Sequence, residues 1–84
     1  HKRQDINVLF VGRLVDWKAV DIVIDAVGQT QEKVNLIIVG DGEERASLTE
    51  YAANKGYSQV KFVGMVPHAQ VNRYYDEADI FVLP

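Results

Sequence analysis

Short apolar runs alternate along this chain with longer segments in which apolar residues recur every three or four positions. The short runs are largely apolar on both faces, as strands are in a parallel sheet that helices cover on both sides. They span residues 7–11, 35–39, 60–63 and 80–83, and the first three are followed or closed by Gly12, Gly40 and Gly64. The pattern therefore predicts four strands.

The segments between these strands have the periodicity of amphipathic helices. The apolar stripes, helix by helix, are Val20, Val23, Ile24 and Val27; Leu48, Tyr51, Ala52 and Lys55; and Val71, Tyr74, Tyr75 and Ala78. We expect the second helix to start near Glu43, with Glu43 and Glu44 in its first turn, and to stop at Gly56. The third is expected to start around His68, which follows Pro67 and is predicted to cap the helix.

Strands that alternate with helices predict an α/β fold, a doubly wound parallel sheet of about four strands with right-handed crossovers. With the usual strand order 3-2-1-4, the ligand crevice is expected at the carboxyl ends of the first and fourth strands. Residues 1–84 are interpreted as a single, partial domain, because the last strand ends at Pro84 without a helix to cover it. Apolar surface left exposed in this way favours self-association.

The amino-acid composition argues against several classes of function. The net charge of −3 argues against a nucleic-acid partner, which would need a basic face. The chain has no cysteine and two histidines, so we expect no disulfide, no cysteine nucleophile and no metal site. No apolar run is long enough to cross a membrane, and a cytoplasmic location is expected.

A candidate anion site follows the first strand. Gly12 allows close backbone approach to a ligand, and the helix that follows presents free N–H groups. Arg13 can bind phosphate oxygens in a bidentate manner, with Lys18 as a second charge. These features favour a diphosphate ligand. In the alternative interpretation, Arg13 and Lys18 are solvated or pair with Asp16 or Asp41.

Several segments, in order and in register, are similar to those of one enzyme family. They are FVGRLV at 10–15 with Lys18, LIIVGDGE at 36–43, VKFVGMVPH at 60–68, and Tyr74-Tyr75 with ADIFVLP at 78–84. In this respect the chain resembles the group 1 (family four) retaining glycosyltransferases. The resemblance spans almost the whole chain.

The resemblance implies a Rossmann-like fold, the first half of the C-terminal, donor-binding domain of a GT-B enzyme. It implies that Gly12, Arg13 and Lys18 bind the diphosphate of a UDP- or GDP-sugar, and that Met65 and Val66 contact the base near Gly40. The parent enzyme would be a hexosyltransferase-type enzyme without a cofactor, acting on a glycan, lipid or small-molecule acceptor. It is expected to be cytoplasmic, with a membrane-peripheral location as the alternative. The family's glutamate pair would follow Pro84, so no catalytic residue falls in this chain, which alone is expected to be inactive.

Two other functions were weighed. A receiver-like signalling module shares the alternation of strands and helices, but it needs acidic residues where the first strand here ends in Gly12 and Arg13. A dinucleotide-binding oxidoreductase domain needs a glycine fingerprint after the first strand. Gly40-Asp41-Gly42 follows the second strand instead, and a tight turn into a helix explains it better.

Overall fold

The computed structural model describes residues 5–14, 17–30 and 33–82, and of residues 17–19 the backbone only. Its elements run in the order β1 (Ile6–Val11), α1 (Trp17–Gln29), β2 (Val34–Val39), α2 (Arg45–Asn54), β3 (Val60–Gly64), α3 (His68–Glu77) and β4 (Ile80–Val82). Within the described ranges the strands form one parallel sheet in the order β3-β2-β1-β4. The predicted α/β fold and strand order are confirmed.

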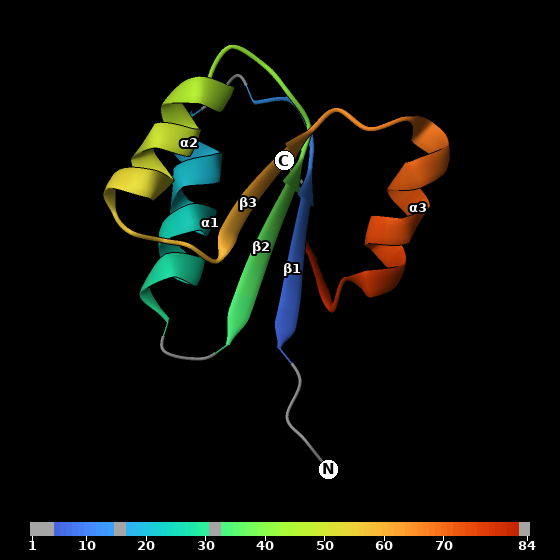
Figure 1. Ribbon diagram of the computed structural model, residues 1–84, viewed down its shortest axis with the longest axis horizontal. Helices are drawn as coiled ribbons and strands as arrows, with labels where there is room; N and C mark the ends of the chain where they lie inside the picture. The colour runs from blue at the N-terminus through green and yellow to red at the C-terminus, as the bar shows by residue number, and fades with distance from the viewer. Residues whose placement is uncertain (1–4, 15–16, 31–32, 83–84) are drawn as a thin grey trace.

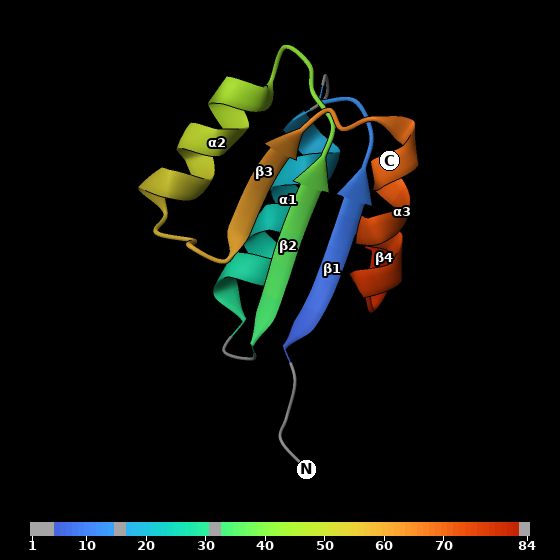
Figure 2. The same ribbon diagram turned by 45° about the vertical axis from the view of Figure 1, so that its right-hand side comes forward.

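Helices lie on both faces of this sheet, with α1 and α2 on one side and α3 on the other (Figure 1). Figure 2 shows the strands with their carboxyl ends pointing the same way and β4 on the far side of β1 from β2. Because the chain must reach β4 from β3, the segment that enters α3 passes over the carboxyl ends of β2 and β1 (Figure 1). This crossing shapes the functional end of the molecule.

The main core lies between the sheet and the α1–α2 layer. Alternate residues of β1 and β2 point into it and meet the apolar stripes of the two helices, as period-two and period-3.6 patterns require. The buried members of this core are Val8, Phe10, Leu14, Val20, Ile24, Val27, Leu36, Ile38, Leu48 and Ala52. Each large apolar side chain buried in this way contributes about 1.5–3 kcal/mol. The predicted stripes of α1 and α2 are confirmed except for Lys55, which is exposed.

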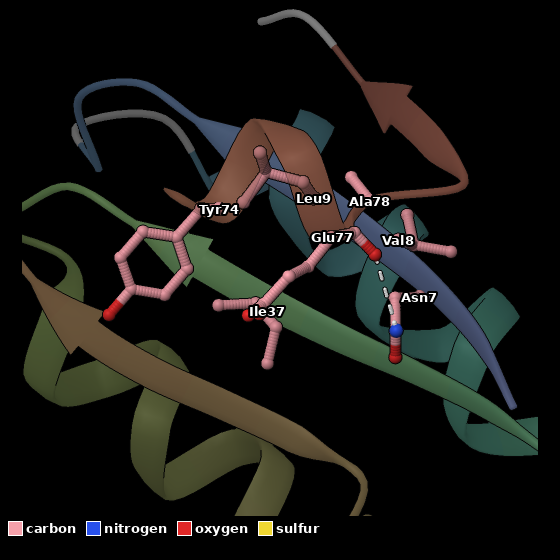
Figure 3. A pocket seen from close by; sticks show the side chains of 7 residues that line it. All are labelled: Asn7, Val8, Leu9, Ile37, Tyr74, Glu77 and Ala78. Atoms are coloured by element: carbon pink, nitrogen blue, oxygen red, sulfur yellow. Dashed lines mark hydrogen bonds between the residues drawn. The ribbon is translucent and has the colours of Figure 1, made fainter. Parts of the chain in front are cut away.

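The opposite face is less completely covered. No residue of α3 is buried; Val71, Tyr74 and Ala78 are half-buried. Tyr75, which the stripe of α3 included, is exposed and packs edge-to-face on Phe81, with ring centroids 4.9 Å apart. Between α3 and the sheet lies a small cavity of about 100 Å³, lined by residues that include Leu9, Tyr74 and Ala78 (Figure 3).

Two helices differ from the sequence prediction at their amino ends, α2 in its first residue and α3 in its cap. α2 begins at Arg45, so Glu43 and Glu44 precede its first turn. The reason is that the Glu44 N–H donates to the Leu14 carbonyl, at 2.8 Å, which holds this segment against the loop after β1. α3 does begin at His68, but Pro67 is the N-cap residue and no side chain caps the helix. Gly56, with φ +76°, follows the end of α2 as predicted.

The amino end of the sheet is closed by polar side chains. Asn7 and Asp79 form a reciprocal pair: the Asn7 N–H donates to the Asp79 carboxylate, and the Asp79 N–H donates to the Asn7 carbonyl, both at 2.8 Å. The Asn7 amide also donates to the Glu77 carbonyl at 3.3 Å (Figure 3). The Asn35 amide donates to Asp5 at 3.1 Å and to the Asn7 side chain at 3.3 Å. These bonds join β2, β1 and the α3–β4 turn.

Candidate functional site

A hollow of about 440 Å³ opens at the carboxyl end of the sheet, above β1 and β2 and beside the segment that enters α3. It is lined by Val11, Gly12, Arg13, Val39, Gly40, Met65, Val66, His68 and Val71. We call it the carboxyl-end hollow. Its volume is in the range of small-molecule sites, which mostly run from about 300 to 1,000 Å³.

Several predicted site residues that lie far apart along the chain come together in this hollow. Gly12 and Arg13 follow β1, Gly40 follows β2, and Met65 and Val66 follow β3, and all five line the carboxyl-end hollow. The ligand crevice was expected between the first and fourth strands, and that expectation stays a prediction; the carboxyl-end hollow lies on the other side of β1. The hollow lies toward β2, because the β3–α3 connection crosses there and forms one of its walls.

Glycines bring the loops at this edge into contact. The Gly12 N–H donates to the Val39 carbonyl at 3.0 Å, and the Gly40 N–H donates to the Gly64 carbonyl at 2.9 Å. Gly40 is buried and has φ +147°, and a Cβ atom at this position would overlap the Gly12 carbonyl oxygen. Backbone atoms of Gly12 and Gly40 therefore form the floor of the hollow. Their close approach is possible only because Gly40 has no side chain.

The loop after β2 is tied to the loop after β1 by two further hydrogen bonds. Leu14 donates its N–H to the Asp41 carbonyl at 3.0 Å and accepts from the Glu44 N–H at 2.8 Å. A Cβ atom on Gly42 would lie 2.6 Å from the Leu14 carbonyl oxygen, so this contact also needs glycine. Gly40-Asp41-Gly42 thus forms a tight turn into α2, as the sequence indicated.

Arg13 is the cation at the rim of the hollow. Its side chain is exposed, and it makes no ion pair or hydrogen bond with any residue that the structure describes. The pairing with Asp41 considered from the sequence is absent, because Asp41 is paired with Arg45 instead, at 3.4 Å. Asp16 and the side chain of Lys18 lie outside the described residues. Of the two pairings considered for Arg13, the structure therefore tests only the one with Asp41.

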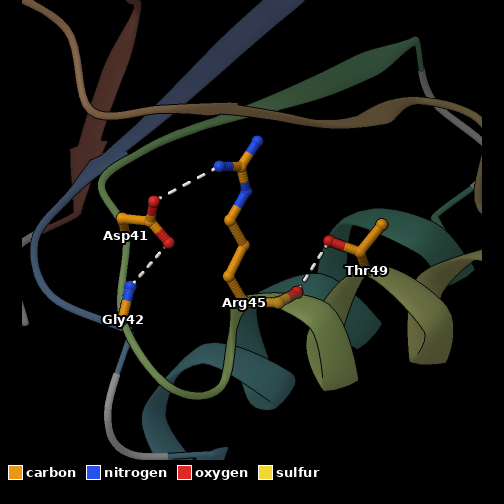
Figure 4. A network of polar contacts seen from close by, with 4 residues as sticks. All are labelled: Asp41, Gly42, Arg45 and Thr49. Carbon is orange, nitrogen blue, oxygen red and sulfur yellow. Dashed lines mark hydrogen bonds and ion pairs between the residues drawn. The ribbon is translucent and has the colours of Figure 1, made fainter.

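Arg45 and Asp41 form a polar network behind this site (Figure 4). Asp41 accepts from the Gly42 N–H at 2.8 Å with its second carboxylate oxygen, and the Thr49 hydroxyl donates to the Arg45 carbonyl at 2.7 Å. Both side chains of the ion pair stay partly exposed, at 40% and 49%. An exposed pair of this kind adds little stability by itself.

The remaining walls are apolar. Val39 is buried, Val11, Val66 and Val71 are half-buried, and Met65 is 74% exposed. Sequence reasoning did not place Val11, Val39, Val71 or His68 here; the end positions of β1 and β2 were the signal for the two strand valines. His68 was predicted as a cap, but it makes no capping hydrogen bond and is one of the residues that line the hollow. A cation at the rim and an apolar wall suit a ligand with a negative part and a flat apolar part.

Two features are absent from the described residues. No group of three or more histidine, aspartate or glutamate side chains is arranged to hold a metal ion there. No helix in the same residues is both long and apolar enough to span a bilayer.

The doubly wound parallel sheet with helices on both faces defines a Rossmann-like domain. The family model described as "Glycosyl transferases group 1" matches residues 1–84. The chain belongs to the group 1 glycosyltransferases. The receiver and oxidoreductase alternatives are not favoured by this result.

Individual relatives agree with the family. The chain is 34% identical over 85 residues to the amylovoran biosynthesis glycosyltransferase AmsK of Erwinia amylovora, covering 96% of this chain and 21% of that protein. It is 37% identical over 76 residues to the putative teichuronic acid biosynthesis glycosyltransferase TuaC of Bacillus subtilis, covering 90% and 18%. The chain thus spans about a fifth of the length of these relatives.

Solved structures share the fold. The apo form of the lipopolysaccharide outer core galactosyltransferase WaaB superposes with a TM-score of 0.78 at 24% identity, over 93% of this chain and 23% of that one. The catalytic domain of cholesterol-α-glucosyltransferase from Helicobacter pylori superposes with a TM-score of 0.80 at 20% identity, over 93% and 49%. At these identities the likeness establishes the architecture.

Proposed function

We propose that this chain is part of the donor-binding domain of a glycosyltransferase, and that its carboxyl-end hollow binds a nucleotide-diphosphate sugar. The observation that carries the proposal is the meeting of Gly12, Arg13, Gly40, Met65 and Val66 around one hollow, with the Arg13 guanidinium unpaired among the described side chains. A group 1 glycosyltransferase needs a sugar donor, and this is the place where the fold and the charge favour one.

In this proposal Arg13 binds the diphosphate, with Lys18 supplying a second charge. During transfer, the bond between the anomeric carbon and the diphosphate oxygen breaks, and a bond to the acceptor oxygen forms. The nucleoside diphosphate leaves with that electron pair, and the acceptor hydroxyl releases its proton to the surrounding water. Negative charge therefore grows on the diphosphate, and a cation fixed beside it stabilises the transition state more than the ground state.

The apolar wall is proposed to receive the base of a UDP- or GDP-sugar. Met65 and Val66 follow β3 directly and supply main-chain groups beside an apolar surface. A hexosyl transfer with retention of anomeric configuration is the reaction that we assign to the whole enzyme, on the strength of the resemblance. The 84 residues alone are proposed to be inactive, since no catalytic residue is assigned to them.

Calorimetric titration of the whole protein with UDP, GDP, UDP-glucose and GDP-mannose tests the proposal. We expect one nucleotide class to bind, and Arg13→Ala to weaken that binding by roughly 10- to 100-fold, because a charge-assisted hydrogen bond is lost. Arg73→Ala is the matched control, since it removes the same charge from an exposed position on α3. Heat from none of the four ligands, or equal losses in the two variants, would contradict the proposal.

A further inference from the structure

Arg45 lies on the far side of the β2–α2 loop from the carboxyl-end hollow, and it does not line it. It is the first residue of α2, and its side chain leaves the helix toward the end of β3 (Figure 4). There its guanidinium lies against Gly64. A Cβ atom built on Gly64 would be 2.9 Å from one guanidinium nitrogen and 3.3 Å from the central carbon.

Gly64 is the last residue of β3 and immediately precedes the wall formed by Met65 and Val66. It has φ +76°, so it requires glycine for its backbone conformation as well as for the space that Arg45 occupies. The Gly64 carbonyl accepts the N–H of Gly40, in the floor of the hollow. A side chain packed on Gly64 therefore acts on both the floor and the wall.

The base of the Arg45 side chain is itself fixed. The Arg45 N–H donates to the Gly42 carbonyl at 3.1 Å, and its guanidinium pairs with Asp41 at 3.4 Å. The Asp41 carbonyl in turn accepts the N–H of Leu14. Arg45 thus reaches from a loop that is anchored to β1 across to the turn that leaves β3. Its planar guanidinium can lie flat on a residue without a side chain, which the ammonium group of lysine would do poorly.

We infer that Arg45 is a positioning residue: it holds the β3–α3 turn at Gly64 and thereby sets the affinity of the carboxyl-end hollow for the base of a nucleotide. The inference rests on the proposed function for its ligand. Its physical basis is the packing against Gly64 and the ion pair with Asp41. A supporting group of this kind holds a binding residue in its productive place without touching the ligand.

The test distinguishes an effect of Arg45 on binding of the base from an effect on binding of the phosphates. The whole protein, Arg45→Ala, Arg45→Lys and the control Arg73→Ala are titrated with the nucleoside diphosphate that binds and with inorganic pyrophosphate. We expect Arg45→Ala to weaken nucleotide binding by about threefold to tenfold and to leave pyrophosphate binding unchanged. Arg45→Lys should not restore the nucleotide affinity. An equal loss for both ligands would make Arg45 a phosphate-binding residue and overturn the inference.

A second measurement needs no ligand. Amide hydrogen exchange at Gly40 reports on its bond to the Gly64 carbonyl, and it should become several-fold faster in Arg45→Ala than in Arg73→Ala. Unchanged exchange at Gly40, or a lowered melting temperature with unchanged nucleotide affinity, would overturn the inference. If the unmodified protein binds neither nucleotide nor pyrophosphate, the proposed function fails, while the exchange result still decides whether Arg45 holds the turn.

Discussion

At the amino end of the sheet, the side chains of Asn7, Asn35 and Asp79 tie the strands together, whereas at the carboxyl end the ties are backbone hydrogen bonds between glycine-containing loops. The first arrangement uses polar side chains for stability. The second leaves Arg13 unpaired among the described side chains beside an open hollow. The difference teaches that backbone hydrogen bonds, with the Arg45 side chain behind them, can tie these loops together without using the cation at the rim of the hollow.

The largest expected effect is at Gly40. Gly40→Ala places a Cβ atom on the Gly12 carbonyl oxygen and forces an alanine to adopt φ +147°. We expect a loss of about 2–4 kcal/mol in the free energy of unfolding, measured by urea titration. Gly56→Ala is the control, because Gly56 also has positive φ (+76°) but nothing lies within 4 Å of its added Cβ.

Gly56→Ala should cost only about 1–2 kcal/mol, the penalty of a left-handed backbone. The difference between the two variants then measures the close approach of the loops. Equal losses would mean that the carboxyl end does not depend on that contact, and the comparison of the two ends would fail at its strongest point.

Arg13→Ala is expected to lower the affinity for nucleotide without changing the stability of the fold. Since Arg13 is exposed and has no partner among the described residues, its removal should change the free energy of unfolding by less than about 0.5 kcal/mol. Nucleotide affinity should fall in the same variant. Urea unfolding of the ligand-free protein checks the first statement, and a large loss of stability would show that Arg13 has a structural role.

Asp79→Ala is expected to have the reverse effect of Arg13→Ala: it should lower the stability and leave the nucleotide affinity unchanged. The Asp79 carboxylate accepts the Asn7 N–H at 2.8 Å, and its loss leaves that donor to water at the amino end. We expect about 1–2 kcal/mol of destabilisation and an unchanged affinity for nucleoside diphosphate. Asp79→Asn, which keeps an acceptor oxygen, should recover part of the stability. A change in affinity would show that the two ends are coupled.

The sequence predicted this fold well because its strongest signals are local. Continuous apolar runs locate the strands, helical periodicity locates α1 and α3, and Gly56 marks the end of α2. Arg13 was predicted from its position just after the first strand, whereas Gly40 and Met65 were assigned through the resemblance to the glycosyltransferase family. The structure places all three around the same hollow because parallel strands bring their carboxyl ends together.

What the sequence did not predict depends on which loops touch. The start of α2 at Arg45 is set by a hydrogen bond from Glu44 to Leu14, thirty residues away. The side of β1 on which the hollow lies depends on the path of the β3–α3 connection. The packing of Arg45 on Gly64 has no local pattern at all, since the two residues meet only after β2 and β3 have paired.

The contact between α1 and α2 belongs to neither end of the sheet and gives the smallest expected effect. The Tyr51 hydroxyl lies 2.7 and 2.8 Å from the two carboxylate oxygens of Asp25, to which it donates. This hydrogen bond to a carboxylate raises the pKa of Tyr51 from 10.0 to about 12. The Lys55 ammonium, 5.3 Å from the ring centroid, lies over the same side chain.

The stability is expected to fall at high pH, because the folded chain holds the Tyr51 proton more tightly than the unfolded chain does. Between pH 10 and about 12 the unfolded chain loses the Tyr51 proton while the folded chain keeps it, so stability falls across this interval. Below pH 10 the contribution is fully present.

Tyr51→Phe should remove this part of the alkaline slope in urea unfolding and leave the affinity for nucleotide unchanged. Identical slopes in the two proteins would show that the Asp25 contact contributes nothing. A change in nucleotide affinity would show that the α1–α2 layer, and not only the carboxyl end, controls the hollow.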